Sequence, residues 1–331
     1  EERLQQRPDL EGGLVEHPFQ APEQPDLDGE GDEGDQAGAA AGAPPGLVDL
    51  AEHRHEVGGV AGAGAPVTIQ NKGSDTMVNL AQVWAEEYKK LRPEVDIEVS
   101  GGGSGVGIAA LIKGTIDLAN ASRNMKPEEI EQARKNTGKE PKEFIIGYDA
   151  LAVFVPKDNP MTEITLAQLA AIFAENGKIT RWSDLGIKMP ADSDEIIRVS
   201  RQSSSGTYEF FREHVLNKRD FKLGSRDLQG SKDVVDLVEG TPCAIGYSGF
   251  GYKTGGVKAV CIAIEEGKPC VEPSLAGAVS GEYPISRALY MYTLGEPEGA
   301  GKAYIAWTRS DAGQTIVEQS GYAPLPADQR K

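Results

Sequence analysis

One arrangement recurs along this chain: a short apolar strand runs into a turn of glycine, serine or threonine, and a helix follows. It occurs around residues 67–77, 96–112, 116–130 and 196–211. Strands that alternate with helices in this way are typical of α/β folds with largely parallel sheets. Ligands of such sheets bind at the carboxyl ends of the strands, where the turns lead into helices. The sequence therefore predicts an α/β fold whose ligand site is built from these four turns.

The most informative turn lies in the stretch 201–211, which reads Arg-Gln-Ser-Ser-Ser-Gly-Thr-Tyr-Glu-Phe-Phe. Serine or threonine before an apolar helical pattern is typical of a helix N-cap. The free N–H groups of a helix start favour an anion, and Arg201 adds a guanidinium that can bind a tetrahedral oxyanion through two hydrogen bonds. Taken alone, the stretch is more typical of an ordinary capped helix with an exposed arginine. The other three turns shift the balance toward an anion site.

All four turns carry hydroxyl groups. The residues concerned are Ser74, Thr76, Ser104, Ser122, Ser203, Ser205 and Thr207. The glycine-rich turn 101–107 lacks the Gly-Lys-Ser/Thr of a P-loop, and the spacing Gly-x-Gly-x-x-Gly of dinucleotide-binding turns does not fit it. An anion nest at a helix start is the best remaining interpretation. Hydroxyl turns that converge with few charges predict a desolvated anion held mostly by neutral donors.

The distribution of titratable residues favours a binding protein over an enzyme. Acid–base enzymes often use a group that titrates near neutrality, but three of the four histidines, at positions 17, 53 and 55, lie in the N-terminal tail. The fourth, His214, falls within a predicted helix as a surface or packing residue. Asp75 is the only carboxylate in the four turns. No third ligand accompanies His53 and His55, so the sequence favours neither a metal nor a cofactor.

Residues 1–66 differ in composition from the rest of the chain. They contain fifteen acidic and three basic residues, a net charge of −12, whereas all 331 residues together carry −17. The segment is rich in glycine, proline and alanine and is predicted to be disordered, because it cannot bury enough apolar surface to offset its ordering entropy. An overall basic surface for nucleic acid is not supported. The chain contains no run of 18 or more apolar residues, so no transmembrane helix is predicted.

The three cysteines leave the thiol chemistry open. Cys261 and Cys270 flank Glu265-Glu-Gly-Lys268, a plausible hairpin turn across which a disulfide could form, and Cys243 would then be left over. One bridge and three free buried thiols are equally compatible with this count, and no CxxC motif indicates zinc or redox work.

Two long, almost continuous apolar runs stand out, at 144–155 and 283–293. The first is interpreted as a buried strand pair or as one crossing strand. Several further elements follow from the apolar pattern. They are helices at 166–173, from Ser231 onward, at 301–307 and at 312–319, and strands at 243–248 and 257–263.

Five motifs in this order resemble a known family, the substrate-binding proteins of phosphate-specific ABC transporters. The motifs are Gly73-Ser-Asp-Thr-Met77, Gly101-Gly-Gly-Ser-Gly105, Ala121-Ser122, Arg201 with Ser203-Ser-Ser-Gly-Thr207, and Tyr283-Pro-Ile-Ser-Arg287. The match covers roughly residues 67–327. The resemblance implies a type II periplasmic-binding-protein fold, in which two α/β lobes joined by two crossing strands close on phosphate. Lobe one would comprise 67–147 plus 288–331, and lobe two 148–287.

The resemblance also implies a set of phosphate-binding residues. They are Ser74, Asp75, Thr76, Met77 through its backbone, Ser104, Gly105, Ser122 and Arg123 in lobe one, and Arg201, Ser203, Ser205, Gly206 and Thr207 in lobe two. Members of the family read Ala-Ser-Asp where this chain has Arg123, and that aspartate accepts the proton of phosphate and rejects sulfate. Arg123 could instead add a second cation. A further aspartate usual in the arginine loop is Ser203 here. Asp75 is the hypothetical substitute acceptor.

The family further implies partners and a location. We expect inorganic phosphate as the ligand, the membrane permease of an ABC importer as the partner, no nucleic acid, and a monomer in the periplasm or otherwise outside the cytoplasmic membrane. The chain begins at Glu1 without a signal peptide, which is expected to have been removed. The alternatives are another tetrahedral oxyanion, such as sulfate or molybdate, or a phosphate sensor or phosphatase-like protein on the same scaffold.

Overall fold

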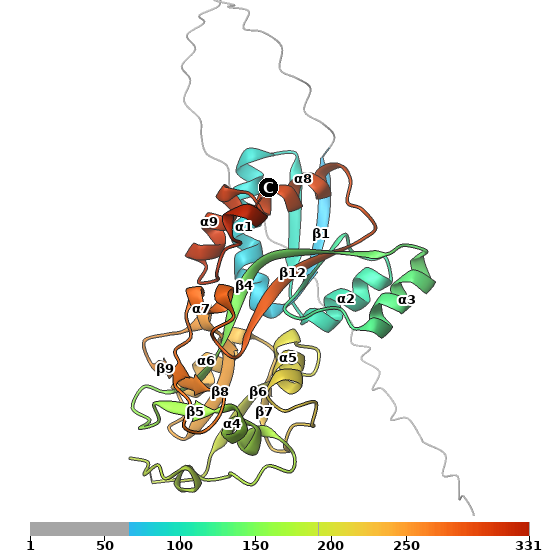
Figure 1. Ribbon diagram of the computed structural model, residues 1–331. Coiled ribbons are helices and arrows are strands. Elements are labelled where there is room, and N and C mark those ends of the chain that lie inside the picture. Colours follow the sequence, from blue (N-terminus) through green and yellow to red (C-terminus); the bar gives the residue numbers. More distant parts are fainter. Residues whose placement is uncertain (1–65, 191, 331) are drawn as a thin grey trace, which may run out of the picture. The chain divides into compact units, whose positions relative to one another are not determined.

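The computed structural model describes residues 66–190 and 192–330 (Figure 1). The segment predicted to be disordered, residues 1–66, therefore lies outside the described residues except for Pro66. The three histidines of that segment, including His53 and His55, which were considered as metal ligands, lie outside the described residues as well.

The main sheet has the strand order β2-β1-β3-β12-β4-β8-β6-β7, with β9 beside β4. The bounds are Val67–Gly73 (β1), Val95–Ser100 (β2), Leu118–Ala121 (β3), Pro141–Pro156 (β4), Ile197–Arg201 (β6), Arg226–Leu228 (β7), Ala244–Gly249 (β8), Val257–Ala259 (β9) and Ser286–Leu294 (β12). Strand β1 runs parallel to β2 and β3, and β6 runs parallel to β7 and β8. The predicted α/β fold with largely parallel strands is thus confirmed, with antiparallel β4 and β12 at its centre.

Helices follow the strands as the sequence pattern predicts. Their bounds are Val78–Leu91 (α1), Ser104–Ile112 (α2), Pro127–Thr137 (α3), Leu166–Phe173 (α4), Gly206–His214 (α5), Ser231–Glu239 (α6), Leu275–Ser280 (α7), Gly299–Thr308 (α8) and Asp311–Gln319 (α9). Short 3-10 helices span Asp75–Met77, Trp182–Leu185, Phe250–Tyr252 and Ala327–Gln329. In the described part of the chain, none of these helices combines the length and the apolarity that a bilayer crossing requires.

The apolar run 144–155 forms one crossing strand rather than a strand pair. The first half of β4 pairs with β12, and its second half pairs with β8 and β9 (Figure 1). On one side of this crossing lie the hydrophobic clusters around Trp84 and Ile108, here called lobe one. On the other lie the clusters around Phe173 and Val234, here called lobe two. The residues at which the chain passes between the lobes, 147/148 and 287/288, stay a prediction.

The single strand predicted for 257–263 is wrong. Strand β9 ends at Ala259, and Val260 donates its backbone N–H to the carbonyl of Val153 at 2.8 Å. A separate strand, Cys261–Ala263 (β10), then joins a three-stranded sheet with Glu163–Thr165 (β5) and Cys270–Val271 (β11). Val260 is still bonded to β4, and the chain changes partner at Cys261, whose N–H donates to the carbonyl of Thr162. The apolar pattern of the sequence does not indicate such a change.

Cys261 and Cys270 form a disulfide across the antiparallel pair β10–β11, with their Cα atoms 5.5 Å apart. The alternative of three free thiols is therefore wrong. Cys243 is a free, buried cysteine whose thiol donates to the carbonyl of Ser193 at 3.0 Å. Burial raises the pKa of the Cys243 thiol, so it is the less reactive protonated form that is favoured.

Replacing both Cys261 and Cys270 by alanine is expected to lower the free energy of unfolding by about 2–3 kcal/mol, because the bridge closes a short loop of sequence separation 9. Denaturant unfolding of the parent and the double variant measures this difference. A reducing agent should destabilise the parent by a similar amount and leave the double variant unchanged. Equal stabilities of parent and double variant would contradict the expectation.

Candidate functional site

The ends of β1, β3 and β6 and the start of α2 bring hydroxyl groups from both lobes into contact. The Thr76 and Thr207 hydroxyl oxygens lie 3.0 Å apart, across the two lobes. Within lobe one, Ser74 donates to the Ser122 hydroxyl at 3.0 Å, and the Ser104 hydroxyl lies 3.3 Å from it. At most 2% of each of these residues is exposed. The structure therefore gathers one buried cluster of neutral donors from four separate turns.

Helix α5 begins inside this cluster. Ser205 is its N-cap, and its hydroxyl accepts hydrogen bonds from the backbone N–H groups of Thr207 and Tyr208. A Cβ at Gly206 would lie 2.3 Å from the Ser104 hydroxyl and 2.6 Å from that of Ser122. Only glycine at this position lets the start of α5 approach the serines of lobe one so closely.

Three backbone N–H groups at this junction, those of Thr76, Ser104 and Gly206, donate to no acceptor within residues 66–190 and 192–330. Ser104 and Gly206 are the first residues of α2 and α5, where such groups carry the positive end of the helix dipole, and Thr76 lies in the 3-10 helix that leads into α1. Two other predicted donors are used within the protein. Met77 donates to the carbonyl of Ser74 at 3.0 Å, and Gly105 donates across the lobes to that of Ser204 at 3.0 Å.

Arg201, the last residue of β6, places a fully buried guanidinium beside the hydroxyl cluster. Its Nη1 donates to the Ser231 hydroxyl at 2.8 Å, and its Nε donates to the carbonyl of Gln229 at 3.0 Å. Burial lowers the pKa of Arg201, and the nearby Asp75 partly offsets that effect. An arginine remains protonated in proteins, so the site keeps a fixed positive charge.

Asp75 brings a carboxylate to the same place. Its Oδ1 accepts the backbone N–H of Gly102 at 2.9 Å, and its Oδ2 lies 3.4 Å from Nη2 of Arg201. A Cβ at Gly101 would lie 2.4 Å from Oδ1, so the glycine-rich turn closes tightly over the carboxylate. Asp75 is thus held in one orientation by backbone and by charge.

The structure does not bring every predicted residue into the cluster. Ser203 is exposed on the loop before α5. The Arg123 guanidinium turns to Glu129, with which it makes two hydrogen bonds of 2.8 and 2.7 Å. Burial lowers the pKa of Arg123, but the hydrogen bond and charge of Glu129 outweigh that effect and raise it. The charge of Arg123 is therefore balanced by Glu129, whereas the sequence suggested that Arg123 could add a second cation to the anion site.

Sequence reasoning assigned no role to several polar residues that the structure places at the junction. Ser231, at the start of α6, lies 3.4 Å from the Thr76 hydroxyl. The sequence could have indicated Ser231, because a further strand–turn–helix arrangement follows β7. Tyr252 donates to the backbone carbonyls of Asp75 and Thr76, each at 3.0 Å. Nothing in the sequence around Tyr252 indicates this contact.

Two charged residues on the crossing strands were also missed. Arg287 and Asp149 are cross-strand partners on β12 and β4 and are 5% and 1% exposed. Asp149 had a signal, because it is the one charged residue in the apolar run 144–155. Arg287 closes a motif that carried the family resemblance, but that motif gave it no function.

An ion pair joins the two lobes next to the cluster. Lys126, which precedes α3, lies 2.8 Å from Glu209 of α5. The Lys126 side chain is 34% exposed and that of Glu209 is 12% exposed. Together with the Gly105–Ser204 backbone hydrogen bond, this pair fastens α5 to lobe one.

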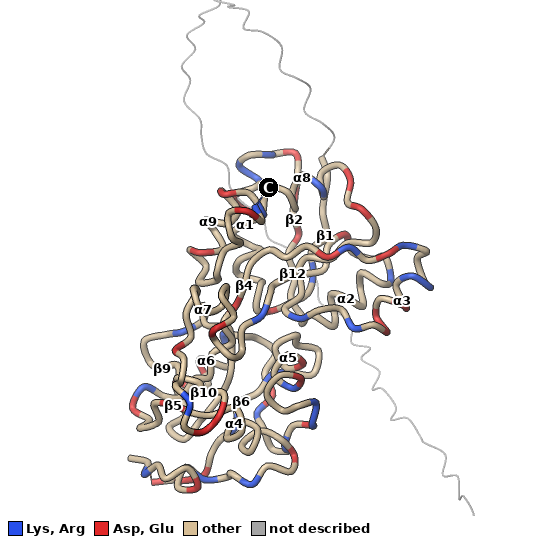
Figure 2. The backbone as a smooth tube through the Cα atoms, in the orientation of Figure 1, with Lys and Arg blue, Asp and Glu red and all other residues tan. Residues whose placement is uncertain are grey.

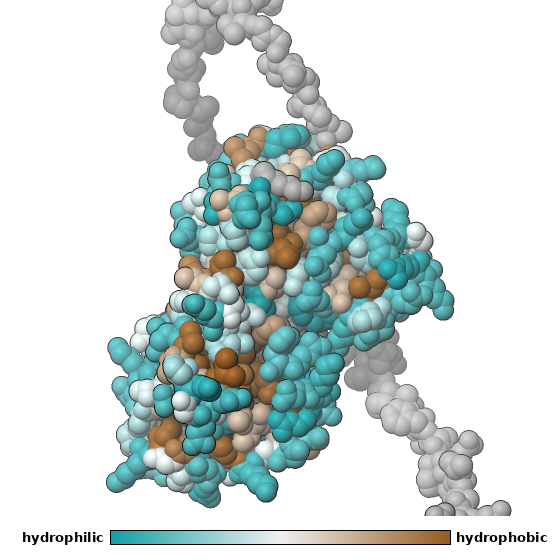
Figure 3. Space-filling view, in the orientation of Figure 1, coloured by the Kyte–Doolittle hydropathy of each residue, from teal (hydrophilic) through white to brown (hydrophobic). Residues whose placement is uncertain are grey.

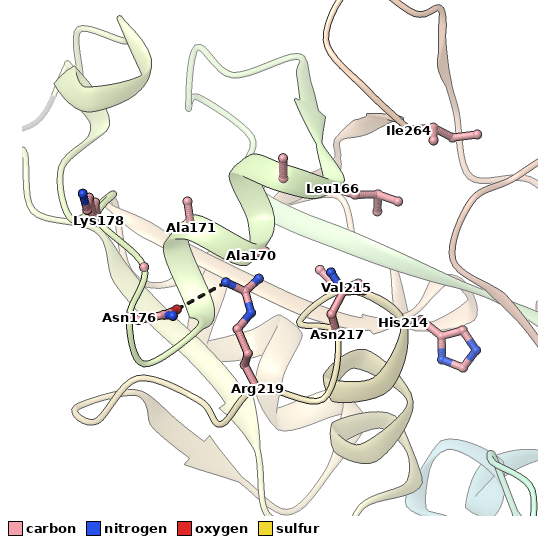
Figure 4. Close-up of a pocket in the computed structure, with 12 residues that line it drawn as sticks. Leu166, Ala170, Ala171, Asn176, Lys178, His214, Val215, Asn217, Arg219 and Ile264 are labelled. Carbon is pink, nitrogen blue, oxygen red and sulfur yellow. Dashed lines mark hydrogen bonds between the residues drawn. The ribbon is translucent and has the colours of Figure 1, made fainter.

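A hollow of about 600 Å³ in lobe two lies between α4 and the segment after α5, and none of the predicted site residues lines it (Figure 4). Arg219 projects into it and donates to Asn176 at 3.2 Å. His214, which also lines it, bonds through Nδ1 to the carbonyl of Phe210 and stacks on that ring. The conspicuous hollow is therefore a different place from the hydroxyl cluster.

The cluster has the chemistry of an anion site. Hydroxyl groups, N–H groups without an acceptor and the buried guanidinium of Arg201 lie together at this junction, and all are hydrogen-bond donors that an anion favours. Among the described residues no group of three His, Cys, Asp or Glu side chains could hold a metal ion. Such a junction can bind and desolvate an oxyanion between two lobes.

Comparisons with known proteins agree with this chemistry. A family model described as a PBP superfamily domain matches residues 59–312. The phosphate-binding protein PstS of Pseudomonas aeruginosa is 37% identical over 302 residues, which cover 88% of this chain and 92% of that protein. The phosphate-binding protein PstS of Bacillus subtilis is 31% identical over 254 residues, covering 76% and 79%.

Solved structures give the same result. A phosphate ABC transporter substrate-binding protein from Clostridium perfringens with bound phosphate aligns with a TM-score of 0.69 at 31% identity, over 78% of this chain and all of that one. An ABC-type phosphate transport receptor from Vibrio cholerae aligns with a TM-score of 0.63 at 27% identity, with 78% and 100% covered. The type II periplasmic-binding-protein fold and the resemblance inferred from the five motifs are thus confirmed. The chain belongs to the PBP superfamily and, within it, to the family of PstS phosphate-binding proteins.

Proposed function

We propose that this protein binds inorganic phosphate between its two lobes and delivers it to the membrane permease of an ABC importer. One observation carries the proposal: buried hydroxyls of both lobes meet around Thr76 and Thr207, beside the buried guanidinium of Arg201. Phosphate offers four oxygens, each of which accepts hydrogen bonds from such donors. The relatives that bear the name phosphate-binding protein support this choice of oxyanion.

In this proposal the anion is held by neutral donors and by one charge. Lobe one contributes the hydroxyls of Ser74, Thr76, Ser104 and Ser122, and the N–H groups of Thr76 and Ser104. Lobe two contributes Arg201, the Thr207 hydroxyl and the N–H group of Gly206. Asp75 accepts a hydrogen bond from the proton that phosphate retains near neutral pH, and a carboxylate at that place disfavours sulfate, which has no proton to donate.

The location, the oligomeric state and the lack of catalysis are part of the same proposal. It acts outside the cytoplasmic membrane as a binding protein and catalyses no reaction. It acts as a monomer, and on the face seen in Figure 3 hydrophobic residues form separate patches rather than one continuous surface. Lys and Arg are spread over both lobes in Figure 2, which favours no single basic face for nucleic acid.

Isothermal titration with phosphate, sulfate and molybdate tests the proposal. Tight binding of phosphate with much weaker binding of the other two is the expected result. Phosphate at a hundred times its dissociation constant should stabilise the protein by about 2.7 kcal/mol in thermal unfolding. Turnover of a chromogenic phosphate ester would point to a phosphatase, and preference for sulfate or molybdate to a different carrier.

The ion pair between the lobes gives a prediction about ligand release. Replacing Glu209 by glutamine is expected to raise the phosphate dissociation rate about threefold to fivefold, because a partly exposed pair contributes roughly 1 kcal/mol to the closed arrangement. Stopped-flow release at low and high salt measures the rate, and the difference should shrink as salt screens the pair.

Glu213→Gln is the matched control for this change. Glu213 lies on the same helix and makes no ion pair with the described residues. Its variant should release phosphate at the parental rate at every salt concentration. Equal acceleration by both variants would show that the overall charge of α5, and not the Lys126–Glu209 contact, sets the rate.

A further inference from the structure

A buried ion pair occupies the strands that join the two lobes. The Nε and Nη2 atoms of Arg287 donate to Oδ2 of Asp149 at 3.0 and 2.8 Å. Both residues are almost fully removed from solvent, and burial raises the pKa of Asp149, an effect that Arg287 opposes. An apolar pair of similar volume is often no less stable than a buried ion pair, so its presence calls for a reason other than stability.

The remaining contacts of Arg287 all lead to the anion site. Its Nη1 donates to the backbone carbonyl of Ser122 at 3.2 Å, and its Nη2 lies 3.4 Å from the Thr76 hydroxyl oxygen. Its guanidinium carbon lies 5.6 Å from the ring centroid of Phe210 on α5. One side chain on a crossing strand thus touches the end of β3, the turn after β1 and the helix that carries Thr207.

Hydrogen-bond chemistry gives the contact with Thr76 a direction. A guanidinium has only donors, so Nη2 occupies a lone pair of the Thr76 oxygen. The hydroxyl proton of Thr76 is then free to point away from Arg287, toward the side where Thr207 lies 3.0 Å away. A hydroxyl that accepts a hydrogen bond from a cation also becomes a stronger donor.

From these contacts we propose that Arg287 is a positioning residue of the anion site: held by Asp149, it fixes the Thr76 hydroxyl as a donor to the bound anion. Asp149 anchors the guanidinium and balances its charge beside Arg201. The inference rests on the proposed function, because the anion that receives the Thr76 proton is phosphate. Arg287 itself acts through Thr76.

A double-mutant cycle on phosphate binding tests this coupling. Arg287→Met and Thr76→Val should each weaken phosphate binding by about tenfold or more, since each removes a charge-linked hydrogen bond. The double variant should bind within about threefold of the weaker single variant, because both changes remove the same directed donor. Losses that multiply in the double variant would overturn the proposal, since a merely structural role of Arg287 would leave the effects independent.

Ser74→Ala provides the control cycle. Ser74 donates to the Ser122 hydroxyl and makes no hydrogen bond to Arg287 among the described residues. Arg287 contacts Ser122 only at its backbone carbonyl, which Ser74→Ala leaves in place, so the two losses should multiply. Coupling of equal size in both cycles would also overturn the assignment to Thr76. Arg287→Lys, which keeps the charge without the planar fork, should recover only part of the affinity.

A folding control accompanies these measurements. Arg287→Met leaves the Asp149 carboxylate buried without a partner, so the cycle is repeated in Arg287→Met/Asp149→Leu, in which both charges are gone. Circular dichroism and thermal unfolding without phosphate establish that each variant is folded. If the parent binds phosphate but the losses of Arg287→Met and Thr76→Val multiply, the positioning role of Arg287 is overturned and the proposed function is not. A parent with no affinity for phosphate overturns the proposed function and this inference together.

Discussion

Replacing Arg201 by alanine is expected to weaken phosphate binding by at least about a hundredfold while the protein stays folded. The guanidinium is fully buried at the end of β6, and truncation of a buried, hydrogen-bonded charge costs about 3 kcal/mol or more in affinity. The loss is larger than that of a single hydroxyl, because Asp75 would then face the bound anion without the cation that now lies 3.4 Å from it. Isothermal titration with phosphate measures the change.

Arg198→Ala is the matched control for Arg201. Arg198 lies on the same strand, and its Nη2 donates to the carbonyl of Leu223 rather than toward the hydroxyl cluster. Its removal changes the net charge by the same amount and should leave phosphate affinity within about twofold of the parent, because distant charges are screened. If Arg201→Ala binds phosphate as the parent does, the stretch 201–211 is only a capped helix.

The turns of this site could be predicted from sequence because each is a local feature. The Ser205 N-cap follows from a serine placed before an apolar helical pattern, and the structure shows its hydroxyl capping α5. The end of β6 at Arg201 follows in the same way from the β-branched residues before it. That these turns lie together follows from a general property of parallel sheets, whose strand ends carry the ligand site.

The partners of the charged residues could not be predicted, because they are chosen by packing between distant segments. From the sequence, Arg123 could be a second cation of the site. In the structure, it is paired with Glu129 in the first turn of α3. Arg287 and Asp149 are 138 residues apart in the chain and meet only because β4 and β12 pair in one register. The break after Val260 has the same origin, because Val260 still donates to Val153 of β4, whereas Cys261 donates to the carbonyl of Thr162 beside β5.

The second large effect is expected for Asp75→Asn, which should reduce the preference for phosphate over sulfate by about a hundredfold. The aspartate that the family resemblance leads one to expect at position 123 is absent here, and Arg123 is paired with Glu129. We therefore expect Asp75, the carboxylate of the four turns, to accept the hydrogen bond of the phosphate proton. Like charges forced together cost several kcal/mol, so loss of the Asp75 charge should mainly improve sulfate binding.

The geometry of Asp75 makes this substitution a clean test. Oδ1 accepts the N–H of Gly102, and an asparagine oxygen can keep that bond and the closed glycine turn. Asp117→Asn is the matched control, because Asp117 also accepts a backbone N–H, that of Gln70, at the opposite end of the strands. Competitive titration of phosphate and sulfate at one pH gives the ratio for each variant. Unchanged discrimination in Asp75→Asn would mean that selectivity comes from the donors alone, because the hydroxyl cluster would then reject sulfate without any carboxylate to accept a proton.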